Sequence, residues 1–160
     1  MFSPMITLEP PSRLKTPALS KSGLTRFLNR ARAAIGLEGY VDVLLADDPT
    51  LRRLNKTFRG KNKATDVLSF PAPDEIAQDH AGDLAISLET ANRQAATYGH
   101  SLRDEVRILL LHGLLHLSGL DHETDDGEMA AREAELRVEL GLSNSLIERV
   151  SKPLKRGRTA

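Results

Sequence analysis

The chain has 160 residues, equal numbers of basic and acidic side chains (22 each) and no cysteine. This length fits one domain, and the lack of cysteine excludes a disulfide framework, a thiolate metal site and a cysteine nucleophile. The sequence has no run of roughly 18 apolar residues, so we expect a cytoplasmic protein without a membrane partner. We place a single domain at residues 21–150, between an N-terminal extension (1–20) and a basic C-terminal tail (151–160).

The net charge of zero hides an uneven distribution of charge along the chain. Residues 1–63 carry 12 basic and 5 acidic side chains, whereas residues 64–150 carry 6 basic and 17 acidic ones. The densest basic segment runs from Arg52 to Lys63 and contains six basic side chains and no acid. Because such a segment favours contact with phosphates, the zero total does not exclude a nucleic-acid partner.

Hydrophobic periodicity and capping residues predict the elements of the domain. In chain order, we expect a helix at 22–35, a strand at 40–46, a helix at 47–57, strands at 65–70 and 82–88, and helices at 89–98, 102–118 and 125–140. The strands at 65–70 and 82–88 can pair as a hairpin, and Pro71 should end the first of them. Because strands and helices do not alternate strictly, the pattern predicts an α+β layer domain.

The helix predicted at 102–118 differs from the others because it is apolar on nearly all sides. From Ile108 to Leu120 its only polar side chains are His112, His116 and Ser118. A helix of this kind belongs in the interior of a domain. Gly119 is suited to end it, since glycine readily adopts the backbone conformation that turns the chain after a helix.

Three histidines on or just after this helix have the spacing of metal ligands. His112 and His116 share one helix face, and a turn at Gly119 can bring His122 back as a third ligand. Burying imidazoles without partners is costly, and a divalent metal can serve all three. Three nitrogen ligands with an open position are typical of a catalytic zinc site. We predict one Zn²⁺ per chain, although nickel (Ni²⁺), copper or iron would also accept these nitrogens.

The residue after the first histidine distinguishes this motif from the zinc-protease signature H-E-x-x-H. In that signature the glutamate is the general base, whereas here the position holds Gly113, which makes a peptidase the weaker alternative. Asp121 and Glu123 flank the third histidine and are either carboxylates that orient the imidazoles or ordinary loop acids. We expect His80 and His100 at the surface in solvated positions.

The basic segment contains the side chain best suited to phosphate chemistry. The planar fork of donors in arginine matches phosphoryl oxygens, and a reaction at phosphorus needs such a cation. An arginine of this segment is therefore a candidate catalytic and substrate-binding residue, and the family resemblance that follows implies that it is Arg59. We predict His116 as a catalytic metal ligand, and Lys61 and Lys63 as contacts to flanking phosphates. Because only 4% of the residues are aromatic, we expect binding to a nucleic acid to be mainly electrostatic and salt-sensitive.

Four motifs in order resemble one family, the YbeY endoribonucleases or rRNA maturation factors of bacteria. They are Leu54-Asn55 followed by Phe58-Arg59-Gly60-Lys61, then Thr65 to Pro71 (TDVLSFP), then Gly82-Asp83 with Ile86-Ser87, and finally the array from His112 to His122. The resemblance runs over about residues 20–140. Leu120 stands where an aromatic residue is usual, and residues 1–20 match no part of the family.

The resemblance implies an α+β fold with a small mixed β-sheet packed with helices and a zincin-like, metal-binding central helix. It also implies a zinc-like ion on His112, His116 and His122, with Arg59 as the functional arginine. The implied activity is cleavage of single-stranded RNA in 16S rRNA 3′-end maturation and late 30S ribosome quality control. The implied partners are RNA, the 30S subunit and a ribosomal protein or ribosome-associated GTPase.

Two alternatives stand beside a metal-dependent endoribonuclease. One is a zinc peptidase or another metallohydrolase on the same scaffold, and the other is a non-enzymatic ribosome assembly factor whose metal is structural. For RNA cleavage, either water or the 2′-hydroxyl of the substrate can be the nucleophile, and the two routes leave different product ends.

Overall fold

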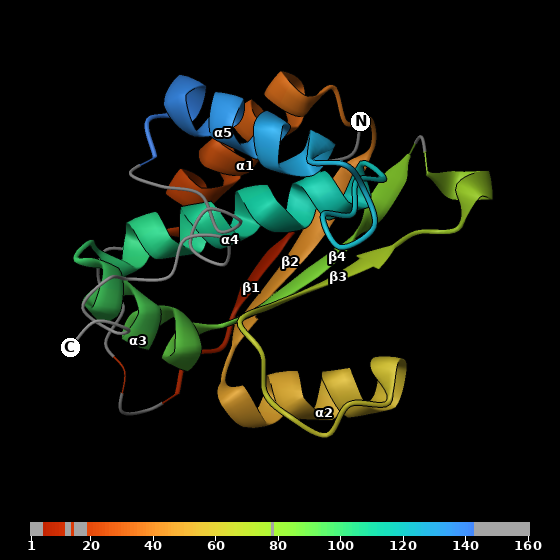
Figure 1. The fold of residues 1–160 in the computed structure, drawn as a ribbon. Coiled ribbons are helices and arrows are strands. Elements are labelled where there is room, and N and C mark those ends of the chain that lie inside the picture. The colour runs from red at the N-terminus through yellow and green to blue at the C-terminus, as the bar shows by residue number, and fades with distance from the viewer. Residues whose placement is uncertain (1–4, 12–13, 15–18, 78, 143–160) are drawn as a thin grey trace.

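The computed structural model describes residues 5–11, 14, 19–77 and 79–142 of the chain. Its elements (Figure 1) are β1 (Ile6–Leu8), α1 (Lys21–Ile35), β2 (Tyr40–Ala46), α2 (Asp48–Arg59), β3 (Val67–Pro71), the 3₁₀ turn η1 (Asp74–Ile76), β4 (His80–Ser87), α3 (Leu88–Tyr98), α4 (Leu102–Leu117) and α5 (Glu128–Leu140). Every element predicted from the sequence is present, with ends that differ by at most three residues. The predicted basic tail at 151–160 lies outside the described residues.

The strands form one mixed sheet in the order β1-β2-β4-β3. Neighbours β1 and β2 are parallel, as are β2 and β4, whereas β3 runs antiparallel to β4. β3 and β4 therefore form the predicted hairpin, joined through η1. The predicted α+β fold with a small mixed sheet packed with helices is confirmed.

Alternation of side chains along the strands assigns the two faces of the sheet. Val43 of β2 and Leu84 of β4 belong to the larger core, which α1, α4 and α5 cover on one side of the sheet (Figure 1). Ala46 and Leu68 point to the other side, where they pack with Leu51 of α2. The sheet is thus covered by helices on both faces.

α4 is the central helix, and it is buried along most of its length. Its first turn is capped as predicted, since the Ser101 hydroxyl accepts a hydrogen bond from the backbone N–H of Asp104 (3.1 Å). Every residue from Ile108 to Leu115 is buried, which confirms the predicted interior position. Within the described ranges, no helix is both long enough and apolar enough to cross a membrane.

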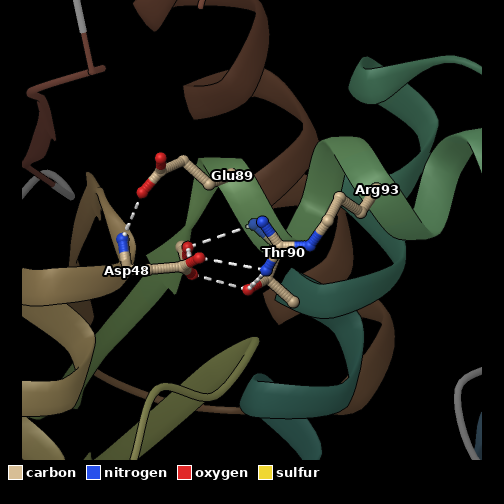
Figure 2. Close-up of polar contacts among 5 residues, drawn as sticks. Asp48, Glu89, Thr90 and Arg93 are labelled. Carbon is tan, nitrogen blue, oxygen red and sulfur yellow. Dashed lines mark hydrogen bonds and ion pairs between the residues drawn. The ribbon is translucent and has the colours of Figure 1, made fainter.

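The N-terminal ends of α2 and α3 meet because these helices follow the parallel neighbours β2 and β4 directly. There, Glu89 of α3 caps α2, and side chains of the two helices bond to each other (Figure 2). The backbone N–H of Asp48 donates to the Glu89 carboxylate (2.8 Å). In return, the Asp48 carboxylate accepts hydrogen bonds from the hydroxyls of Ser87 (2.5 Å) and Thr90 (2.6 Å) and from the guanidinium of Arg93 (3.0 Å). These contacts fix the start of α2 against the sheet.

Three local features differ from the expectations. β1 was not predicted. It lies within the proposed N-terminal extension, and its Ile6 pairs with β2. β3 continues through Pro71, because an edge strand loses no sheet hydrogen bond where the proline nitrogen faces outward. α5 begins at Glu128, since the Asp125 carboxylate binds the backbone N–H groups of Gly127 and Met129 (both 2.9 Å) from outside the helix.

The prediction of solvated surface positions for His80 and His100 is wrong. The His80 ring stacks on Tyr40, with centroids 4.4 Å apart, and its Nε2 lies 3.0 Å from the Gly82 carbonyl oxygen. The His100 Nε2 lies 2.6 Å from a carboxylate oxygen of Glu105, and these side chains are only 7% and 0% exposed. Both histidines are therefore packed between neighbours rather than solvated.

Candidate metal centre and cleft

His112, His116 and His122 converge at the C-terminal end of α4. One ring nitrogen from each lies within 4.8 Å of the other two. The Nε2 atoms of His112 and His116 are 3.2 Å apart, and the ring centroids of the three pairs are separated by 4.8, 5.3 and 5.7 Å. The structure therefore brings the three predicted metal ligands together.

The turn after α4 brings the third histidine back to the helix. Gly119 has a φ of 103°, a left-handed conformation that residues with side chains rarely adopt. Its backbone N–H donates to the carbonyl of His116 (3.0 Å), and the N–H of Leu120 donates to the carbonyl of Leu115 (3.2 Å). The predicted chain reversal at Gly119 is confirmed, and it places His122 beside the two helical histidines.

Glu133 of α5, which no motif in the sequence marked, orients the first histidine. Its carboxylate lies 2.8 Å from Nδ1 of His112, and its side chain is 1% exposed. A carboxylate accepts hydrogen bonds, so Nδ1 carries the proton and Nε2 keeps its lone pair toward the other imidazoles. A signal for Glu133 exists in the sequence, because an acid interrupts the apolar stripe of Met129, Leu136 and Leu140 on α5.

The donor set fits a divalent metal. Nδ1 of His122 is buried, and no residue in the described part of the chain forms a hydrogen bond with it. Burial, followed by the neighbouring His112 and His122, lowers the pKa of His116, so its imidazole is neutral and can donate a lone pair near pH 7. Neutral imidazoles with one orphaned ring nitrogen suit zinc and other divalent transition metals.

The acids beside the third histidine have a different role from Glu133. The Asp121 carboxylate accepts a hydrogen bond from the backbone N–H of Glu123 (3.1 Å), and its carbonyl accepts one from the Thr124 hydroxyl (3.4 Å). Of the two alternatives that the sequence left open, this geometry favours loop acids for Asp121 and Glu123. The carboxylate that orients an imidazole comes instead from α5.

Gly113 is required by the packing of α4 on the sheet. A Cβ at this position would lie 2.8 Å from a methyl carbon of Leu84 and 3.3 Å from the hydroxyl oxygen of Ser69. The Ser69 hydroxyl also donates to the Gly113 carbonyl (3.3 Å). A side chain here, such as the glutamate of the H-E-x-x-H signature, would require Leu84 to shift.

The three histidines line a cleft of about 510 Å³ together with the predicted phosphate-binding residues. Arg59 ends α2, two residues beyond the predicted end of that helix, and Lys61 and Lys63 follow in the loop. No ion pair joins any of these cations to a residue of the described ranges. The cleft is therefore lined both by cations without ion pairs in the described ranges and by three histidines that could hold a metal ion.

Asn55 holds the basic loop against α2. Its side chain is buried, and its amide nitrogen donates to the carbonyl of Lys63 (2.9 Å). Its backbone carbonyl accepts a hydrogen bond from the N–H of Lys61 (3.2 Å). These two bonds tie both lysines to the end of the helix. Asn55 belongs to the motif Leu54-Asn55, but no chemical signal in the sequence marked it as a positioning residue.

A second group with metal-like spacing in the described residues is Asp42, His80 and Asp83. Its histidine differs from the triad because Nε2 lies 3.0 Å from the Gly82 carbonyl oxygen, which can only accept a hydrogen bond. That nitrogen is therefore the donor to the carbonyl. Of the two groups, only the triad lines the cleft that also holds Arg59.

Comparisons with known proteins agree with this geometry. The family model described as "Endoribonuclease YbeY" matches residues 14–141. A relative of that name from Koribacter versatilis is 54% identical over 142 residues, which cover 89% of this chain and 91% of the relative. One from Solibacter usitatus is 46% identical, with 88% and 89% covered.

A solved structure extends this similarity to the fold. The solution structure of a Thermotoga maritima protein aligns with a TM-score of 0.54 at 26% identity, and the alignment covers 93% of this chain and 94% of that protein. The family model spans the four sequence motifs, the basic loop and all three clustered histidines. The chain therefore belongs to the YbeY family of endoribonucleases, which are phosphodiester hydrolases.

Proposed function

We propose that this protein is a metal-dependent endoribonuclease that cuts single-stranded RNA in the cleft between α4 and the basic loop. The observation that carries the proposal is that three metal-ligating histidines and three cations without acidic partners, among the residues described, line one cavity. Charge that develops on phosphoryl oxygens during phosphodiester cleavage needs such stabilisation from fixed positive groups.

We assign one Zn²⁺ to His112, His116 and His122, with Ni²⁺ or another divalent transition metal as the alternative. When bound, such an ion supplies a Lewis acid for the developing phosphoryl charge. Glu133 keeps the proton of His112 on Nδ1 and so presents Nε2 to the ion. His116 acts as a catalytic residue through its place in the ligand set.

We assign the cations of the cleft to different phosphates of the RNA. Arg59 binds the oxygens of the phosphate to be cut, because its planar fork offers two donors at once. Lys61 and Lys63 bind the neighbouring phosphates and hold the strand in register. Their shared attachment to Asn55 keeps the two lysines at a fixed position relative to Arg59.

We infer that the RNA is the 3′ end of 16S rRNA and that the protein acts in the cytoplasm on late 30S subunits, in maturation and quality control. Membership of the YbeY family supports this role. Residues 64–150 carry 17 acidic side chains, which weakens binding to RNA in general. A ribosomal protein or a ribosome-associated GTPase then supplies the specificity for this RNA, which electrostatic attraction alone does not provide.

Two other functions have less support. A zinc peptidase of the H-E-x-x-H type has its general base directly after the first histidine, where this chain has Gly113, so a peptidase would need a base from elsewhere. A purely structural zinc site has four protein ligands, whereas this triad offers three and lines an open cleft.

Elemental analysis paired with an RNA-cleavage assay tests the proposed function. His116→Ala is expected to lose both metal and cleavage, while Arg59→Glu keeps metal and fold but loses cleavage. Arg26→Glu, an exposed position on α1, is the matched control and should cut normally. Metal-free protein that cuts RNA at the full rate would overturn the proposal, as would cleavage of a peptide library in place of RNA.

The ends of the cleavage products distinguish the two possible nucleophiles. A 5′-phosphate on the products identifies water as the nucleophile, and a 2′,3′-cyclic phosphate identifies the 2′-hydroxyl.

A further inference from the structure

A second hollow, of about 780 Å³, lies on the outer side of α2. Its lining includes Arg52, Arg53 and Lys56 of the helix and Asn62 and Lys63 of the loop. Lys63 lines both this hollow and the cleft that holds the histidines. The two concavities are therefore neighbours at the loop after α2, and both are bordered by Lys63.

The hollow is lined mainly by basic side chains, and those on α2 are exposed to solvent. Arg52, Arg53 and Lys56 are exposed on α2, and none of them forms an ion pair with a residue that the structure describes. Arg52 is held in place, because its Nε donates to the side-chain oxygen of Asn62 (2.8 Å). Three cations on one helix face that continue into Lys63 form a track of positive charge.

The lining of the hollow contains one acid, Asp48, against the four cations Arg52, Arg53, Lys56 and Lys63. The Asp48 carboxylate is engaged by two hydroxyls and a guanidinium at the junction with α3 (Figure 2). The Asp47 carboxylate, outside the lining, caps α2 through the backbone N–H of Thr50 (2.9 Å) and attracts Arg53. The hollow is therefore basic in sum, and its charge is partly offset at the N-terminal end of α2.

We propose that the outer face of α2 (Arg52, Arg53 and Lys56) is a second RNA-binding surface, which takes the strand as it leaves the cleft past Lys63. This proposal rests on the proposed function, because it assumes that RNA occupies the cleft. The lining contains no aromatic side chain among the described residues, so the surface contacts phosphates rather than stacking on bases, and it binds without sequence preference. α2 has 12 residues and is about 18 Å long, so the surface adds contacts only for RNA that extends beyond the cleft.

Binding of RNAs of different length tests this surface. The double variant Arg53→Gln/Lys56→Gln removes two charges, and Arg26→Gln/Arg30→Gln removes two exposed charges from α1, across the sheet from α2. Arg52 is left in place because it holds the loop. All proteins carry His116→Ala so that the RNA is not cut, and each is titrated with single strands of about 4 and about 16 nucleotides.

We expect the α2 variant to bind the longer RNA about tenfold or more weakly at about 0.1 M salt, with a slope of log affinity against log salt that is shallower by about 1.4. The loss for the shorter RNA should be far smaller, and the α1 variant should bind both RNAs normally. Unchanged affinity and slope for the longer RNA would overturn the proposal, and so would equal losses for both lengths. Loss of binding to an acidic polypeptide, with RNA binding intact, would assign the surface to a protein partner instead and overturn it as well.

The proposed function can fail separately from this inference. If the protein with an intact His116 does not cut RNA, the proposed function is contradicted, yet the length dependence of binding still decides the role of α2. If it cuts RNA while the α2 variant binds the longer strand normally, only the second surface is contradicted.

Discussion

Glu133 is a charged residue at a position where the pattern of α5 requires an apolar one. It shares a buried helix face with Met129, Leu136 and Leu140, and its carboxylate is satisfied by His112 of α4. A buried carboxylate without such a partner would be strongly destabilising. The acid at this position is explained by the tautomer that it imposes on His112.

Replacement of Glu133 by glutamine tests this role. The glutamine side chain has the same size and its amide oxygen can still accept from Nδ1, but it lacks the charge that strengthens the bond. We expect Glu133→Gln to bind zinc about 10- to 100-fold more weakly, as measured by competition with a chromophoric chelator. Glu139→Gln, an exposed position on the same helix, is the control. Equal zinc affinity of the two variants would show that Glu133 does not act on the metal site.

Gly113 is the second residue whose identity follows from its surroundings. Its missing side chain allows α4 to approach Leu84 of the sheet. We expect Gly113→Ala to reduce the free energy of unfolding by about 1–3 kcal/mol in urea denaturation, because the added methyl overlaps Leu84. In a Leu84→Ala background the same change should cost less, since the overlapping side chain is gone. Additive costs of the two substitutions would contradict this explanation.

Two helices, α2 and α3, are joined at their N-terminal ends by hydrogen bonds. The Asp48 carboxylate lies at the first turn of α2 and receives three hydrogen bonds from α3 and its cap. α2 carries Arg59 at its opposite end, where the helix borders the cleft. The junction therefore anchors the helix that presents the proposed catalytic arginine.

The pH dependence of stability reports on this junction. Burial raises the pKa of Asp48, but the hydroxyls of Ser87 and Thr90 and the Arg93 guanidinium outweigh it, and the pKa is lowered from the ordinary value of 3.8. The contribution of the carboxylate is therefore complete above pH 3.8 and is lost as the pH falls through the lower folded value.

We expect Asp48→Asn to be less stable than the native protein by roughly 1–2 kcal/mol at pH 7. The difference should narrow below pH 3.8, where the native carboxylate becomes protonated too. Urea unfolding across this range provides the measurement, with Glu139→Gln as a control. A difference that stays constant with pH would mean that the charge of Asp48 does not stabilise the junction.

Elements with clear periodicity were predictable from the sequence, and elements set by distant contacts were not. α1 and α4 follow from their apolar patterns and caps. β1 has only three residues, too few to show alternation, and it exists because β2 offers an edge. The longer α2 and the late start of α5 likewise depend on local hydrogen bonds, such as that of Asp125 to Met129, that spacing does not reveal.

The candidate site was predictable to a similar extent. Spacing alone placed His112 and His116 on one face and suggested that Gly119 returns His122. The approach of the basic loop to these histidines is a tertiary contact, which the family resemblance implied and the periodicity did not. Glu133 comes from another helix, 21 residues after His112, and its pairing follows only from the packing of α5 on α4.

The whole molecule separates opposite charges that cancel in the total of zero. The basic segment from Arg52 to Lys63 forms α2 and the loop after it, on one wall of the cleft. The acidic second half supplies α4, which carries His112 and His116, and α5, which carries Glu133. If RNA lies along the basic wall as proposed, its binding should weaken steeply with salt.

Cleavage rate measured against zinc occupancy tests most directly whether the histidine cleft is the site of RNA cleavage. The native protein is freed of metal with a chelator, zinc is added back stepwise, and bound zinc and cleavage of a single-stranded RNA are measured in the same samples. We predict that the rate rises in proportion to bound zinc and saturates at one ion per chain. A cleavage rate that is already complete without metal, or that does not follow occupancy at the first equivalent, would contradict the assignment.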